Sequence, residues 1–122
     1  MPTGRTKPDR TILSPQQLTR LLAGRRAQVI DIRIPGQWEQ AHIRGSRNVD
    51  VGDLAGEVVM LDRELPIVLY DNEGESAAEA AEALRAAGIT AFSLHGGLDA
   101  WVANGNPVEG EGLAPGAPVS TT

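Results

Sequence analysis

The strongest constraint on this fold is an apolar run that stops abruptly at an acidic loop. Residues 66–70 read Pro-Ile-Val-Leu-Tyr, a composition typical of a buried β-strand. Asp71 ends the run, a short polar segment follows, and a helical pattern occupies residues 76–87. A strand, a loop and a helix in this order aim backbone N–H groups and the positive end of a helix dipole at one point. The sequence therefore predicts an anion cradle at residues 71–76.

Strand-like and helix-like segments alternate along the rest of the chain. Short strands are expected at residues 11–13, 29–33, 48–51, 67–70 and 92–94. Helical segments are expected at residues 15–26, 37–41, 54–61, 76–87 and 98–102. Ser14 and Gln17 have the spacing of a capping box, with Pro15 at the first helical position. This alternation predicts an α/β domain with a mainly parallel sheet of about five strands and helices on both faces.

The expected domain covers residues 11–108. The polar residues 1–10 and the Pro- and Gly-rich residues 109–122 are predicted to be disordered tails. A chain of 122 residues suits one domain with one modest core. In a parallel sheet ligands bind at the carboxyl ends of the strands, which again points to the loop after residue 70.

The chain contains no cysteine. This composition excludes disulfides, thiolate metal sites and any thiol or persulfide chemistry by its own residues. The first ten residues lack the apolar stretch of a secretory signal, and no apolar run approaches the roughly 20 residues of a membrane helix. We therefore expect a cytoplasmic protein without a membrane partner.

The two halves of the chain carry opposite charge. Residues 1–47 hold nine Lys and Arg against three acidic residues, whereas residues 48–122 hold two against thirteen. Such asymmetry either steers a partner or reflects a basic tail and solvated acidic helix faces. Nucleic acid is not an expected partner, because the half that bears the loop is acidic.

Three motifs together resemble a single rhodanese domain. Residues 29–33 read Val-Ile-Asp-Ile-Arg and are followed by Trp38 and Glu39, then by His-Ile-Arg-Gly-Ser-Arg-Asn at residues 42–48. Residues 67–70 resemble the strand that leads into the family's active loop. Residues 94–101 read Leu-His-Gly-Gly-Leu-Asp-Ala-Trp and resemble the family's closing motif. The matches occur in the family's order, and the resemblance implies a three-layer rhodanese fold.

The resemblance also implies what the loop has lost. Active rhodaneses carry sulfane sulfur on a loop cysteine, and this chain has Asp71 at that position. Glu75 stands where an active rhodanese often has arginine, and Ala77 where related cell-cycle phosphatases need one. No catalytic residue is therefore assigned. The family includes modules with aspartate at this position, typically the silent half of a tandem pair or a regulatory module.

Three interpretations of Asp71 are considered. Its carboxylate occupies the cradle in place of an external anion, or it is a solvated acid at a helix start. The third, a nucleophile of the phosphotransferase type, is disfavoured because the metal-binding and second-aspartate context is absent.

The candidate site is the active-loop equivalent. Its residues are Asp71, Asn72, Glu73, Gly74, Glu75 and Ser76. Their carboxylates offer oxygen ligands to Ca²⁺ or Mg²⁺ but lack the pattern of a calcium loop, so no metal and no cofactor is expected. An acidic rim that recognises an arginine or lysine of a basic protein partner is the preferred use.

The remaining candidate residues are expected to have structural rather than catalytic roles. Asp31 and Arg33 are expected to form an ion pair that supports the loop, as the resemblance implies. His42 and His95 are each a lone histidine without a second ligand nearby. Two glycines, Gly96 and Gly97, are expected at positive φ, and both tryptophans, Trp38 and Trp101, in the core.

Two functions are consistent with these residues. The first is a catalytically silent rhodanese-like module that binds a protein partner through residues 71–76, as a regulator or scaffold. The alternative is a divergent sulfurtransferase-family protein that handles a small sulfur compound or another ligand without a cysteine nucleophile.

Overall fold

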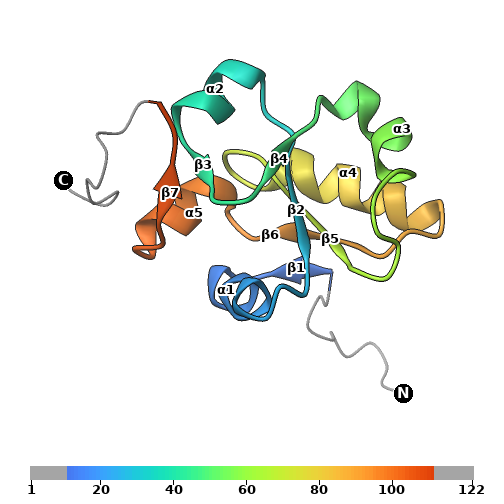
Figure 1. Ribbon diagram of the computed structural model, residues 1–122, viewed down its shortest axis with the longest axis horizontal. Helices are drawn as coiled ribbons and strands as arrows, with labels where there is room; N and C mark the ends of the chain where they lie inside the picture. Colours follow the sequence, from blue (N-terminus) through green and yellow to red (C-terminus); the bar gives the residue numbers. More distant parts are fainter. Residues whose placement is uncertain (1–10, 112–122) are drawn as a thin grey trace.

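A five-stranded parallel sheet forms the centre of the molecule (Figure 1). The computed structural model describes residues 11–111. Across the sheet the strands are β1 (Ile12–Leu13), β6 (Ala91–Leu94), β5 (Ile67–Tyr70), β2 (Gln28–Asp31) and β4 (Arg47–Asn48). Every neighbouring pair is parallel. The expected α/β fold with a mainly parallel sheet is confirmed.

Helices cover both faces of the sheet (Figure 1). The helices are α1 (Pro15–Ala23), α2 (Pro35–Gln40), α3 (Leu54–Val58), α4 (Glu75–Ala86) and α5 (Gly97–Ala103), with a 3₁₀ turn η1 (Val51–Asp53) before α3. Ile30 and Leu69 pack on the α3–α4 side, whereas Val29 and Val68 pack on the α1–α5 side. Successive strand residues point to opposite faces, so each apolar strand contributes to two cores.

Helix α1 begins at the predicted capping box. The Ser14 hydroxyl accepts a hydrogen bond from the Gln17 N–H at 3.1 Å, and the Gln17 side chain accepts from the Ser14 N–H at 2.8 Å. Pro15 occupies the first turn, where no backbone donor is needed.

The expected strand at residues 48–51 is wrong in position. Arg47 and Asn48 pair with β2, the Val49 N–H donates a last hydrogen bond to the Asp31 carbonyl at 3.0 Å, and Val51 already belongs to η1. Asp50 caps that turn, since its carboxylate accepts from the Gly52 N–H at 2.8 Å. A local side-chain hydrogen bond therefore ends the extended segment early.

A second, antiparallel pair of strands was not predicted. β3 (His42–Ile43) pairs with β7 (Val108–Glu109). The Glu111 N–H also donates to the Glu39 carbonyl at 2.6 Å. The tail expected from residue 109 therefore starts too early, because residues 109–111 are tied to the domain. The tails expected at residues 1–10 and 112–122 lie outside the described residues.

The segment after β2 also differs from the expectation. The helical turn expected at residues 37–41 begins earlier, with Pro35 in the first turn of α2. Trp101 lies in the core, but Trp38 is only partly buried and stacks on His42 with ring centroids 3.9 Å apart. Its indole N–H donates to the Ser46 hydroxyl at 3.1 Å, which satisfies its polar end.

Tyr70 connects the sheet to the β3 segment. Its ring is fully buried, and its hydroxyl accepts from the Ile43 N–H at 3.0 Å and lies 3.0 Å from the Ser46 hydroxyl. Burial and the nearby negative charge of Asp31 raise the pKa of Tyr70 above its ordinary value. Within residues 11–111, no helix combines the length and apolar character needed to cross a membrane.

The raised pKa gives a test, because Tyr70 is the sole tyrosine of the chain. We expect its phenol to stay protonated at pH 10 in the folded protein and to be about half ionised in urea-unfolded chain, which ultraviolet difference titration measures. The free energy of unfolding should therefore fall as the pH rises above 10, since the unfolded state releases a proton that the folded state keeps. Ionisation at the same pH in both states would contradict this account.

Tyr70→Phe supplies the control for that titration. Loss of the hydroxyl leaves the Ile43 N–H without its acceptor and should cost about 1–3 kcal/mol at neutral pH. The difference in stability from the wild type should shrink above pH 10, where only the wild type loses stability through this group.

Candidate functional site

The candidate site lies where two neighbouring strands end. β2 and β5 are parallel with Asp31 opposite Tyr70, so the segments that follow both strands emerge at the same edge of the sheet. The structure thereby brings the predicted loop residues and the predicted supporting pair together. Strand order, rather than any local signal, produces this juxtaposition.

The Asp71 carboxylate occupies the cradle of backbone N–H groups. One oxygen, Oδ1, accepts from the Gly74 N–H at 2.5 Å. The other, Oδ2, accepts from the N–H groups of Ser76 at 2.9 Å and Ala77 at 3.3 Å, in the first turn of α4. These donors have no partner within the helix, so the carboxylate caps α4 from three residues before its N-cap Gly74. The geometry agrees with the first reading of Asp71 and not with a free solvated acid.

The first turn of helix α5 is hydrogen-bonded to the loop backbone. The N–H groups of Leu98 and Asp99 donate to the carbonyls of Asp71 and Asn72 at 2.8 and 3.0 Å. The backbones approach so closely that a Cβ on Gly97 would lie 2.5 Å from the Asp71 carbonyl oxygen. Gly96 and Gly97 have φ of +72° and +63°, as expected. Glycine is required here by both backbone conformation and space.

Asp31 and Arg33 form the predicted ion pair. Asp31 is fully buried, and its carboxylate accepts from the Arg33 backbone N–H at 2.8 Å and from the Arg33 side chain at 2.7–3.1 Å. The guanidinium also donates to Asn72 Oδ1 at 3.2 Å and to the Ala41 carbonyl at 2.5 Å. Arg33 thus connects the end of β2 with the loop and with the residue before β3.

This pair leaves Arg33 charged but already engaged. Burial lowers the pKa of the guanidinium, and the hydrogen bonds and negative charge of Asp31 more than compensate, so the pKa is raised overall. Only 7% of the side chain is exposed. The positive charge nearest the loop is therefore neutralised within the protein rather than offered to an anion.

An open hollow of about 450 Å³ lies beside the loop. The residues that line it are Ile32, Arg33, Ile34, Gln37, Val51, Asp71, Asn72, Glu73, Glu75 and Ser76. The hollow combines an apolar wall with an acidic rim, on which Glu73 and Glu75 are exposed. The apolar wall was not predicted from the sequence. The available signal was Ile34, an apolar residue outside the expected strands and helices, whereas Val51 was assigned to the expected strand at residues 48–51.

The two histidines do not contribute to this hollow. His42 Nδ1 lies 2.6 Å from the Trp38 carbonyl, and its Nε2 lies 3.6 Å from a Glu109 carboxylate oxygen, which links α2 to β7. His95 is exposed, and its backbone N–H donates to the Leu13 carbonyl at 2.7 Å. In the described part of the chain, no group of three or more His, Cys, Asp or Glu is arranged to hold a metal ion.

A parallel α/β sheet with its N–H cradle at the carboxyl edge is the frame of a rhodanese. The family model of the rhodanese-like domain matches residues 14–104, so the chain belongs to this family. It is 34% identical over 90 residues to the thiosulfate sulfurtransferase GlpE of Pseudomonas aeruginosa, a match that covers 73% of this chain and 81% of GlpE. It is 35% identical over 78 residues to the uncharacterized protein YqhL of Bacillus subtilis, covering 63% of this chain and 62% of YqhL.

Solved structures give the same fold. A rhodanese-related protein from Thermoplasma volcanium matches with a TM-score of 0.73 at 24% identity, over 80% of this chain and 95% of that one. The Alr3790 protein from Anabaena matches with a TM-score of 0.73 at 28% identity, over 80% of each chain. The expected rhodanese fold is confirmed.

The cradle contacts predict a local stability effect. Asp71→Ala removes the acceptor of three N–H groups at the start of α4 and should cost about 1–2 kcal/mol of unfolding free energy. Glu73→Ala removes an exposed carboxylate from the same loop and should change stability by less than about 0.5 kcal/mol. Urea unfolding of both variants measures the difference. Equal effects would contradict a capping role for Asp71.

Proposed function

We propose that this chain is a catalytically silent rhodanese-like domain that acts as a protein-interaction or regulatory module through residues 71–76. The observation that carries the proposal is the Asp71 carboxylate seated in the N–H cradle of a chain without cysteine. Sulfane-sulfur transfer needs a thiolate nucleophile, and no residue of this chain supplies one. The chain therefore resembles sulfurtransferases in its fold and loop backbone, but it lacks the cysteine sulfur that reacts in them.

The electrostatics of the loop support the same proposal. An attached carboxylate competes for the cradle at a high effective concentration, so a free anion is at a disadvantage. Asp71, Glu73 and Glu75 also repel thiosulfate or phosphate, whereas Arg33 is engaged by Asp31 and Asn72. The face instead favours arginine or lysine side chains of a basic partner.

The alternative is a divergent sulfurtransferase-family protein that handles a small ligand without a cysteine. The open hollow beside the loop and the name of the GlpE relative favour it. Any such reaction must proceed without a persulfide on this chain. This alternative function predicts turnover by the wild-type protein.

A sulfurtransferase assay decides between these functions. With thiosulfate and cyanide, we expect the wild type to show no turnover above background and Asp71→Cys to show measurable turnover, because the new thiolate would lie among the same N–H donors. Glu73→Cys is the matched control, since it places the only cysteine two residues away and outside the cradle. Turnover by the wild type would refute the proposed function and favour the alternative.

Charge reversal tests the proposed partner face. Glu73→Lys with Glu75→Lys should reduce capture of a protein partner from a lysate of the chain's own organism by about tenfold or more, because rim charges act on association. Glu64→Lys with Glu82→Lys is the matched control, since both residues are exposed and the net charge changes equally. Quantitative mass spectrometry reads the captured protein. Equal capture by both double variants would contradict recognition through the loop.

A further inference from the structure

An apolar groove runs between α3 and α4 and is not part of the loop. Its volume is about 380 Å³. The residues that line it are Val51, Leu54, Ala55, Val59, Arg63, Ala80, Ala83, Leu84, Ala87 and Ile89. Apart from Arg63, all are apolar. The groove therefore offers contact area to an apolar side chain rather than a polar binding site.

The groove continues into the hollow beside the loop. Val51 lines both. Ser76 lines the hollow, and Ala80, Ala83 and Ala87 line the groove. These four residues are spaced four, three and four apart, so they follow one side of α4. From residue 76 to residue 87 this side is about 16 Å long, enough for three turns of a docked helix.

Large apolar side chains are exposed along the same line. Within residues 11–111, four are exposed: Ile34 at 65%, Val51 at 57%, Val59 at 60% and Met60 at 81%. Ile34 and Val51 line the hollow, and Val51 and Val59 line the groove. Three of the four, Ile34, Val51 and Val59, thus lie on one connected surface, which distinguishes them from singly scattered apolar residues and supports an interaction site there.

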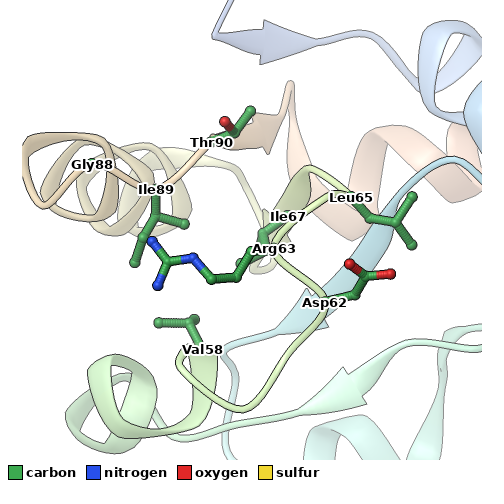
Figure 2. Close-up of a pocket in the computed structure, with 8 residues that line it drawn as sticks. All are labelled: Val58, Asp62, Arg63, Leu65, Ile67, Gly88, Ile89 and Thr90. Carbon is green, nitrogen blue, oxygen red and sulfur yellow. The ribbon is translucent and has the colours of Figure 1, made fainter.

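The charges beside this surface have a direction. At the loop end lie Asp71, Glu73 and Glu75, and Glu79 is exposed one turn further along α4. At the other end lies Arg63, whose side chain extends between Val58 and Ile89 (Figure 2). A complementary occupant is therefore basic at the end that faces the loop and is not basic at the far end.

We propose that this groove docks an amphipathic helical segment of the partner protein, with its apolar side on Val51, Val59 and Ala83 and its basic end against Glu73 and Glu75. The inference rests on the proposed function, because it names the chemistry of the partner that the loop recognises. Apolar burial supplies the contact, and the acidic rim sets its orientation.

A designed peptide tests the groove directly. The probe is a helical peptide of about four turns with leucine along one side, lysine on the polar side of one end and glutamine elsewhere, and its binding is measured by fluorescence anisotropy. We expect it to bind at least about tenfold more tightly than the same pattern with glutamate in place of lysine. It should also bind at least about tenfold more tightly than a leucine–lysine peptide whose order forms no apolar side. Equal binding of the two lysine peptides would overturn the proposal, because charge alone would then explain it.

Two protein variants locate the contact. Ala83→Lys places a cation in the groove and should weaken binding of the helical peptide by about tenfold or more. Ala103→Lys adds the same charge at an exposed position at the end of α5, outside the groove, and should change binding less than about twofold. Equal binding by the two variants would overturn the proposal.

The outcomes also separate this inference from the proposed function. If Glu73→Lys with Glu75→Lys loses the captured partner and Ala83→Lys retains it, the loop function holds and the groove is refuted. If the wild type turns over thiosulfate, the proposed function fails whatever the peptide does. If the helical peptide does not bind and the chain forms a dimer that Ala83→Lys dissociates in sedimentation equilibrium, the occupant is a second copy and the proposal is overturned.

Discussion

The buried ion pair of Asp31 and Arg33 sets the geometry of the whole carboxyl edge of the sheet. Asp31 has no solvent exposure, so its charge is tolerated only with a partner in contact. Removing one member of such a pair typically costs about 3–5 kcal/mol, because the other charge is left buried and uncompensated. Arg33 also reaches Asn72 in the loop and the carbonyl of Ala41 before β3. The Asn48 side chain connects β4 to the same region, because its amide donates to the carbonyls of Asp31 and Arg33 at 3.0 and 2.9 Å.

A second constraint follows from the first. Once the loop is fixed from β2 and from α5, its N–H groups converge on one point, and that point needs a negative group. In this chain Asp71 provides it from within. The same frame that would activate a thiolate in an active rhodanese here stabilises a helix start. In this chain the cradle of N–H groups therefore binds the Asp71 carboxylate as a helix cap, and Glu73 and Glu75 form an exposed acidic rim beside it.

Much of this was predictable from local patterns. The strands around Val29 and Val68 carry dense β-branched runs, and Ser14 with Gln17 shows the spacing of a capping box; the structure confirms all of these. Rhodanese-like motifs supplied the pairing of Asp31 with Arg33 and the glycines at residues 96 and 97. The failures lie where the signal is weakest. β3 and β7 are two residues long, too short for a period, and the side-chain cap at Asp50 ended the strand expected to reach Val51.

Local sequence patterns are enough to predict alternating strands and helices, and the rhodanese-like motifs imply that a carboxylate stands where the family carries a thiol. Both are properties of neighbouring residues, so no knowledge of packing is needed. Only the folded structure shows that both oxygens of Asp71 are engaged, that the charge of Arg33 is used internally, and that Val51 joins the hollow to the groove on α4. These depend on contacts between segments far apart in the chain, which strand order and helix packing decide.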